Sequence, residues 1–234
     1  MLKRLFFSLV ASCLLGTAVH AADETSLQPF ALDFAVSRND KPLGEARLSL
    51  ESQAQGNWTF RTHTLGTAGL ASLAGVEIDE RSEFRWQAGR PETLRYAFDQ
   101  KMRFKSRRRG ITVMPQARRV SAHDDDGEYH LDFESGLIDR NLVVLAIATD
   151  LAAGREPLSY RIADKKKIDT QTYRVAGRES LRTARGEVET IRVERVRSQP
   201  GRQTTTWFAP SMHYLPVRIR QIEPDGEVLD MQLR

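Results

Sequence analysis

Apolar and polar residues alternate along most of the chain. Phe30, Leu32, Phe34 and Val36 occupy every second position near the start, and similar runs recur to the end of the sequence. Because successive side chains of a β-strand point to opposite faces, this period of two predicts strands with one buried face. Turn-forming residues separate the runs, as between Asn39 and Gly44, so neighbouring strands should pair antiparallel. The pattern predicts about a dozen strands.

One segment has the pattern of a helix instead. From Leu142 to Leu151 the apolar residues fall on more than one face. Asp139 stands shortly before this segment and Gly154 follows it. An acidic residue before a helix and a glycine after it are typical end signals. Since the segment is apolar on more than one face, we expect this helix to pack against the sheet.

Together these elements predict a mainly β fold: a large antiparallel curved sheet or open half-barrel with one packed helix. A glycine-rich break at residues 65–75 predicts a loop with one helical turn, bearing Leu70 and Leu73. No repeat, low-complexity tract or linker divides the chain. Its length of 234 residues fits one large β domain or two small ones, and we favour one.

The N-terminus has the pattern of a secretory signal peptide. Lys3 and Arg4 precede a mostly apolar stretch from Leu5 to Val19, which ends at Ala21 with small residues suited to signal peptidase. The stretch is shorter than the roughly 20 apolar residues that a comfortable membrane span needs. We therefore predict a signal peptide at residues 1–21, cleavage after Ala21, and a β-rich periplasmic domain at residues 22–234. An uncleaved N-terminal anchor is the alternative.

A second alternative concerns Cys13, the only cysteine of the chain. The residues before it weakly resemble the cleavage box of a lipoprotein, which would leave an acylated cysteine at the N-terminus. The apolar stretch continues past Cys13 to Val19, whereas a lipoprotein box should end it, so we favour the secretory signal. In both cases the β domain has no disulfide, and its stability must come from packing.

Composition limits the classes of function. Charged residues make up 28% of the chain and the net charge is +4, which is typical of a globular protein rather than a disordered one. A periplasmic location makes nucleic acid an unexpected partner.

The C-terminal part carries a resemblance to a known family. It contains the segments Thr206–Pro210, Tyr214–Ile219 and Asp225–Glu227, which follow a strand meander, a glycine-rich loop and one helix. In this order and in these motifs the chain, over roughly residues 30–233, resembles the uncharacterised periplasmic family DUF3108, a domain of unknown function. His213 stands where a small or acidic turn residue is more usual in the family, so no role transfers to it.

That resemblance implies a class of protein rather than a reaction, because the family has no established activity. Its half-barrel character is similar to that of envelope carriers that hold lipids or the acyl chains of lipoproteins. This second link is an analogy between folds, and folds host many functions.

A row of basic residues is the first candidate binding site. On one extended strand, alternate residues would line one face, with Met102 and Phe104 pointing to the core. Such a row could bind phosphate-bearing ligands, such as lipid headgroups, lipopolysaccharide or cell-wall polymers. The alternative is a solvated face paired with acidic neighbours. The candidate residues are Lys101, Arg103, Lys105, Arg107 and Arg109.

Catalytic and metal motifs are weaker. His123, the three aspartates at 124–126 and His130 could suggest a metal site, but they lack calcium-loop spacing and Asp126-Gly127 is explained as a turn. No nucleophile motif of the common hydrolases or metalloproteases occurs. We therefore expect no metal and no cofactor, and we consider an enzyme less favoured than a binding protein.

Three classes of function remain open. We favour a non-catalytic envelope binding or carrier protein for a hydrophobic or anionic ligand. The second class is a structural or assembly factor of the envelope that acts through contacts with other envelope proteins, and the third is a hydrolase of envelope polymers.

A concave apolar face would distinguish the first class. We expect one helix to leave part of this face uncovered, and each large side chain in water forgoes roughly 1.5–3 kcal/mol of burial. The inward-facing residues predicted from the alternation are Phe30, Leu32, Phe34, Leu48, Leu50, Trp58, Phe60, Phe84, Trp86, Leu94, Tyr96 and Phe98.

Overall fold

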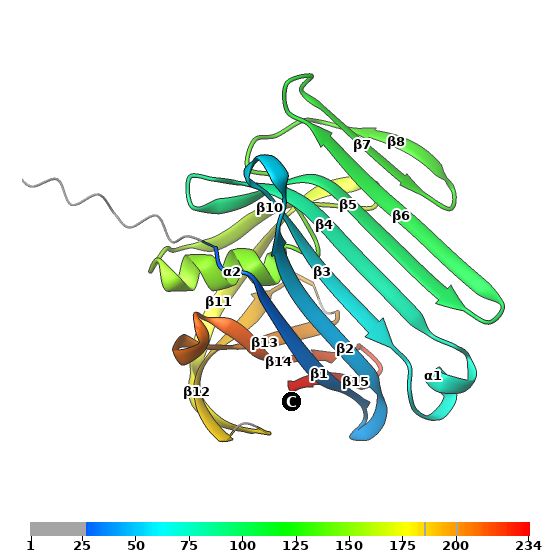
Figure 1. Ribbon diagram of the computed structural model, residues 1–234, viewed down its shortest axis with the longest axis vertical. Helices are drawn as coiled ribbons and strands as arrows, with labels where there is room; N and C mark the ends of the chain where they lie inside the picture. Colours follow the sequence, from blue (N-terminus) through cyan, green and yellow to red (C-terminus); the bar gives the residue numbers. More distant parts are fainter. Residues whose placement is uncertain (1–26, 185, 200) are drawn as a thin grey trace, which may run out of the picture.

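The computed structural model describes residues 27–184, 186–199 and 201–234, so the predicted signal peptide and Cys13 lie outside the described residues. Within the described part, fifteen strands form one sheet, which confirms the predicted mainly β class (Figure 1). The strands of the first half are β1 (Phe30–Arg38), β2 (Lys41–Ser52), β3 (Asn57–Leu65), β4 (Glu77–Gln87), β5 (Arg90–Met102), β6 (Lys105–Met114), β7 (Arg119–Asp124) and β8 (Gly127–Leu131).

The second half of the chain continues the sheet and holds the longer helix. The helices are α1 (Gly69–Leu73) in the glycine-rich loop and α2 (Val143–Ala152), close to the predicted segments. The strands of this half are β9 (Ile138–Asp139), β10 (Leu158–Asp164), β11 (Lys167–Thr183), β12 (Gly186–Val196), β13 (Gln203–Ala209), β14 (Leu215–Ile222) and β15 (Val228–Leu233).

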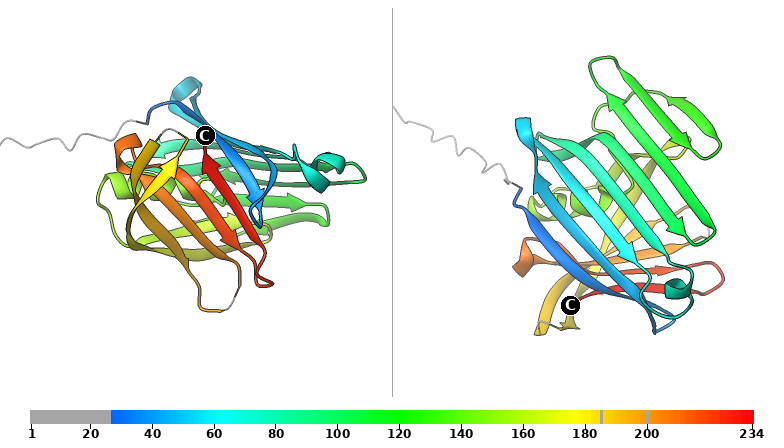
Figure 2. Two further views of the ribbon diagram at one scale, coloured as in Figure 1. Left: turned by 90° about the horizontal axis from the view of Figure 1, so that it is seen from below. Right: turned by 45° about the vertical axis from the view of Figure 1, so that its right-hand side comes forward.

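The strand order joins the two ends of the chain at the middle of the sheet. The order is β8-β7-β6-β5-β4-β3-β2-β1-β15-β14-β13-β12-β11-β10-β9. Neighbouring strands pair antiparallel, and the short β9 pairs parallel with β10. The sheet curls so far that Leu137, just before β9, accepts a backbone hydrogen bond of 3.0 Å from Thr93 on β5. The result is the open half-barrel that the sequence predicts (Figure 2).

α2 lies inside one end of the half-barrel. Its residues Leu145 and Ile147 are buried in the same core as Phe34 and Phe60 of the inner sheet face. The polar contacts of Asp150, which is fully buried near the end of the helix, hold α2 in place. Asp150 accepts a hydrogen bond of 3.0 Å from the Tyr160 hydroxyl and pairs with the guanidinium groups of Arg90, at 3.1 Å, and Arg155, at 3.3 Å.

The concave face is covered by more than the predicted helix. We expected one helix to leave part of the apolar face uncovered, and the C-terminal strands curl over the part that α2 does not reach. Phe208, Val217 and Leu233, from β13, β14 and β15, join the core against the N-terminal strands. Eight of the twelve predicted inward-facing residues are consequently buried: Leu32, Phe34, Leu48, Leu50, Phe60, Phe84, Tyr96 and Phe98.

Gly44 on β2 allows two segments to approach closely. A Cβ atom at this position would lie 2.0 Å from the backbone oxygen of Leu65, at the end of β3. Leu43, the residue before it, accepts backbone hydrogen bonds from Thr67 and Ala68 at the start of the α1 loop. Glycine is therefore required for the α1 loop to sit against β2.

Replacing Gly44 with Ala should lower the free energy of unfolding by about 1–3 kcal/mol, because the backbone must move to relieve the overlap. Urea denaturation measures the change. Gly201→Ala is the matched control, since a methyl group there meets only ordinary contacts and should cost little. Equal stability of the two variants would contradict the prediction.

Candidate functional site

An apolar cavity of about 200 Å³ remains at the end of the half-barrel opposite to α2. α2 packs near Phe30, at the start of β1, whereas the cavity begins at Val36, near the end of the same strand. The α1 loop and the ends of β14 and β15 complete its wall. The apolar side chains of the lining include Val36, Leu65, Ile78, Ile219, Leu229 and Met231.

The size of the cavity limits what it can hold. Pockets that enclose a drug-sized ligand have volumes of about 300–1,000 Å³. At about 200 Å³ this cavity can take an apolar side group or the end of a longer chain, but it cannot enclose a whole acyl chain. Among the residues that the structure describes, Thr64 and Gln221 are the uncharged polar side chains of the lining, and no charged side chain lines the cavity.

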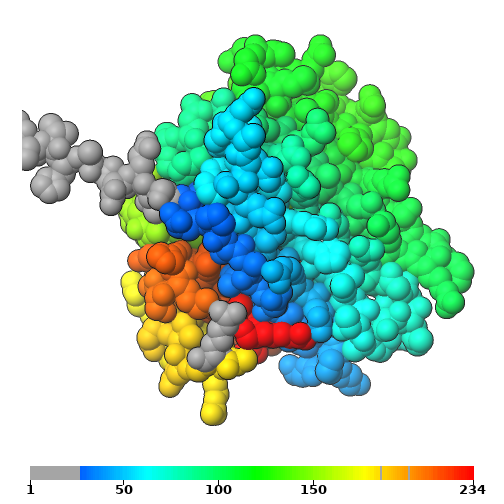
Figure 3. Space-filling model, viewed as in Figure 1, coloured from blue at the N-terminus to red at the C-terminus, as the bar shows by residue number. Residues whose placement is uncertain are grey.

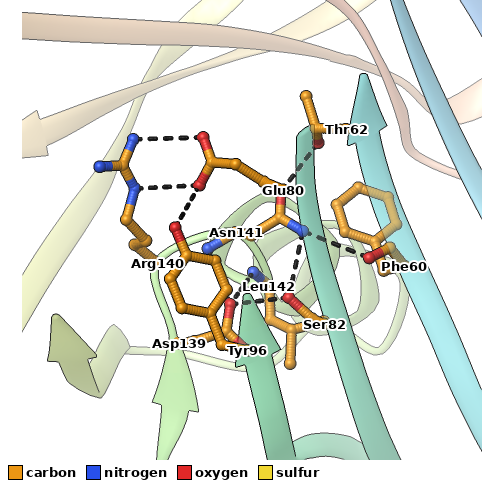
Figure 4. A network of polar contacts seen from close by, with 9 residues as sticks. All are labelled: Phe60, Thr62, Glu80, Ser82, Tyr96, Asp139, Arg140, Asn141 and Leu142. Carbon is orange, nitrogen blue, oxygen red and sulfur yellow. Dashed lines mark hydrogen bonds and ion pairs between the residues drawn. The ribbon is translucent and has the colours of Figure 1, made fainter. Parts of the chain in front are cut away.

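A network of polar contacts lies deeper in the half-barrel, between the cavity and α2. Thr64 and Ile78 line the cavity and pair with each other across β3 and β4. Thr62 and Glu80 are the next pair on the same face and belong to the network. Figure 4 shows how these side chains meet residues 139–142, at the start of α2.

Asp139 is the centre of the inner half of this network and is fully buried. Its carboxylate accepts hydrogen bonds of 2.8 Å from the Ser82 and Thr93 hydroxyls. It also accepts bonds of 2.9 and 3.2 Å from the backbone N–H groups of Asn141 and Leu142. Burial raises the pKa of Asp139 to about 6, although the hydrogen bonds from Ser82 and Thr93 act in the opposite direction. The carboxylate thus joins β4, β5 and the start of α2.

The outer half of the network contains an ion pair. Glu80 Oε2 lies 3.2 Å from Arg140 Nε and accepts a hydrogen bond of 2.6 Å from the Tyr96 hydroxyl. Burial raises the pKa of Tyr96, and the charge of Glu80 raises it further, so the hydroxyl remains a donor. Arg140 retains 36% of its side-chain exposure and Glu80 retains 13%. Solvent can therefore reach this pair, whereas Asp139 is closed off.

The structure also places side chains of the types that act as nucleophiles or metal ligands in other proteins. The hydroxyl of Ser82 is buried and donates to Asp139, so it does not face the cavity as a nucleophile would. His123 lies against Gly110 in the β6–β7 pair, and Asp124 accepts a hydrogen bond from Tyr129 across the β7–β8 turn. In the part of the chain that the structure describes, no three His, Cys, Asp or Glu side chains gather as a metal site would require.

The five predicted basic residues do not share one face, and this geometric prediction is wrong. β5 ends at Met102 and β6 begins at Lys105, so a tight turn at Arg103 and Phe104 divides the row. Lys105 pairs with Met102, and its face of β6 carries the inward-facing residues, whereas Lys101 pairs with Ser106 on the outer face. Phe104 does not point into the core and is 94% exposed.

Two of the basic residues lie further along the inner face of β6. Arg107 pairs with Gln100, and Arg109 pairs with Phe98, with its guanidinium 4.1 Å from the ring centre. The row of basic residues therefore passes from the outer face of β5, through the turn, to the inner face of β6. Whether any of these residues binds a ligand stays a prediction.

The comparisons with known proteins agree with the sequence motifs. A family model described as "Protein of unknown function (DUF3108)" matches residues 33–234. The chain belongs to the DUF3108 family. No curated protein matches this DUF3108 chain.

Solved structures are also similar to it, among them the following two. The first is the crystal structure of a beta-barrel-like protein of the domain of unknown function DUF1849 from Brucella abortus. It has a TM-score of 0.54 and 10% sequence identity, over 88% of this chain and 95% of that one. The second is the hypothetical lipoprotein YmcC from Escherichia coli K12, with a TM-score of 0.31 and 10% identity, over 88% of this chain and 84% of that one. The first likeness shows a shared fold, and the second score is too low to support an argument.

Sequence patterns found some parts of the site of this DUF3108 protein and missed others. Asp139 was expected as a signal for the start of the helix, and its bonds to the backbone of Asn141 and Leu142 confirm that role. The Glu80–Arg140 pair was missed. The position of Glu80 on a face that is otherwise inward-pointing was the available signal, because a charged residue there requires a partner.

Proposed function

We propose that this protein is a non-catalytic binding protein of the bacterial envelope that takes the end of an apolar chain into the cavity beside α1. The observation that supports the proposal is the cavity itself, which is lined by apolar side chains from both halves of the chain. Such a space stays poorly hydrated, so an apolar group that enters it gains burial without displacing well-bound water. The end of an acyl chain has the required chemistry.

The polar network supports a binding role rather than a reaction. Asp139 is buried among four donors, and Glu80 is held by Arg140 and Tyr96, so the carboxylates near the cavity already have partners. These paired side chains can support a bound apolar chain without reacting with it. A hydrolase of envelope polymers would need a water-accessible pair of carboxylates converging on a cleft.

The proposed location is the periplasm, with residues 1–21 removed and residues 22–234 forming one β-rich domain. The sequence pattern of the N-terminus supports this location. Among the described residues, no helix has the length and apolar character needed to cross a bilayer.

A cavity-filling substitution tests the binding proposal. Ala71 on α1 lines the cavity, and Ala71→Phe should fill it and weaken the binding of dodecanoate at least tenfold. Calorimetric titration of the purified protein with dodecanoate measures the affinity. The matched control is Ala97→Phe, because Ala97 is exposed on the outer face of β5 and should leave binding unchanged.

Two outcomes would contradict the proposal. The first is a wild-type protein that does not bind dodecanoate, and the second is equal affinity in Ala71→Phe and the wild type. Either outcome would favour the alternative, an assembly factor that acts through contacts with other envelope proteins.

A further inference from the structure

Three large apolar side chains project into solvent from one corner of the sheet. Leu70 and Leu73 on α1 are 80% and 72% exposed, and Phe104 in the β5–β6 turn is 94% exposed. The two segments lie side by side, since Arg103 donates a backbone hydrogen bond of 2.8 Å to Ala74. They form the lower right corner of the face drawn in Figures 1 and 3, and Figure 2 places them together from two other directions.

This corner, residues 69–74 and 101–107, is called the apolar tip below. Its apolar side chains are unusual because the other exposed large apolar residues of the described chain are less exposed, for example Val175 at 44% and Val196 at 46%. A single exposed leucine needs no explanation, but three large side chains gathered on two adjoining turns indicate a contact surface.

The apolar tip is also positively charged. Lys101, Arg103, Lys105 and Arg107 are all exposed. Lys101 lies 3.6 Å from Glu77. Arg103, Lys105 and Arg107 form no ion pair with any residue that the structure describes, although most other arginines of the sheet do. The Arg103 guanidinium lies 5.9 Å from the centre of the Phe104 ring. Since no described carboxylate neutralises these three charges, they can meet an anionic surface.

Turns that carry both apolar and basic side chains fit the surface of an anionic bilayer. Apolar side chains enter the boundary between headgroups and acyl chains, while lysine and arginine meet the lipid phosphates. A bilayer needs no matching shape, which suits side chains that project singly from turns. A flat apolar face would instead suit a protein partner.

We propose that the apolar tip docks onto a bilayer containing anionic phospholipid, with Leu70, Leu73 and Phe104 in the interface and the basic side chains at the headgroups. This docking does not depend on the binding of an apolar chain in the cavity. It does bring α1, which forms part of the cavity wall, to the membrane surface.

Vesicle flotation tests the proposal. Each protein is purified after export by its host, and mass spectrometry confirms that the variants carry the same N-terminus as the wild type. The wild type should float with vesicles of phosphatidylglycerol and phosphatidylethanolamine, bind at least tenfold less to vesicles of phosphatidylcholine, and be released as salt rises. Binding to the anionic vesicles should be at least tenfold weaker for the triple variant Leu70→Ser/Leu73→Ser/Phe104→Ser. It should be weakened by at least the same factor in the triple variant Arg103→Gln/Lys105→Gln/Arg107→Gln. All six positions are exposed, so circular dichroism should stay unchanged.

Matched controls carry the same kinds of substitution away from the apolar tip. Val175→Ser/Val196→Ser and Arg119→Gln/Arg178→Gln/Arg182→Gln should float like the wild type. Equal loss in a tip variant and its control would overturn the proposal, as would equal binding to neutral vesicles. A wild type that binds no anionic vesicle would also overturn it and would leave an acidic protein as the partner of this surface. None of these results depends on dodecanoate binding.

Discussion

Replacing Asp139 with Ala should lower the free energy of unfolding by about 3–5 kcal/mol at a pH near 5. The carboxyl group is fully buried and accepts bonds from two hydroxyls and two backbone N–H groups. Alanine would leave all four donors without an acceptor in a place that water does not reach. Each buried donor without a partner costs about 1–3 kcal/mol, and relaxation of the hydroxyls of Ser82 and Thr93 recovers part of the sum.

Urea denaturation of the wild type and the variant measures this loss. Asp33→Ala is the matched control, because the Asp33 side chain is more than half exposed and forms an ion pair with Arg47 at the surface. Exposed ion pairs contribute about 0–1 kcal/mol, so the control should change little. A loss of less than about 1 kcal/mol for Asp139→Ala would mean that the network does not hold α2 to the sheet.

Many of the strands could be predicted because one face is buried and the other is in contact with solvent, as in β1 and β2. The alternation from Phe30 to Val36 assigns the buried positions correctly, and Phe34 is fully buried in the structure. The helix from Leu142 to Leu151 was predicted within one residue of the observed α2 at each end. In both cases the information is local, since it depends on side chains a few positions apart.

The turn between β5 and β6 could not be found in the same way. Arg103 and Phe104 form the turn, and neither residue is a typical turn former. The alternation of basic residues continues across it, so the sequence resembles one long strand. A two-residue turn reverses the chain, and the positions after it take their faces from the pairing with β5 rather than from Lys101.

The cavity was even harder to predict from the sequence than the turn. Its wall combines Val36 and Ile78 with Ile219 and Met231, which come from opposite halves of the chain. Local periodicity predicts which side chains face inward but not which distant strand will cover them. The curvature of the sheet determines which strands cover these side chains, and the pairing of β1 with β15 brings the two halves of the chain together.

Stability should also depend on pH through Asp139. Its pKa is about 6 in the folded protein because burial disfavours the charged form, against an ordinary value of 3.8. Between these values the folded protein holds a proton that the unfolded chain has released. Raising the pH through this window therefore destabilises the folded state, by about 3 kcal/mol in total, since each pKa unit is worth about 1.4 kcal/mol.

The comparison of the wild type with Asp139→Asn isolates this effect, because asparagine cannot titrate. Glu134 and Asp124, whose pKa values are lowered by their partners, titrate equally in both proteins and cancel from the difference. The free energy of unfolding of the wild type, minus that of Asp139→Asn, should fall by about 3 kcal/mol as the pH rises from about 3 to about 8. Urea titrations at a series of pH values measure it. A difference that stays constant would show that Asp139 titrates normally, and one that rises with pH would mean that the donors around the carboxylate outweigh its burial.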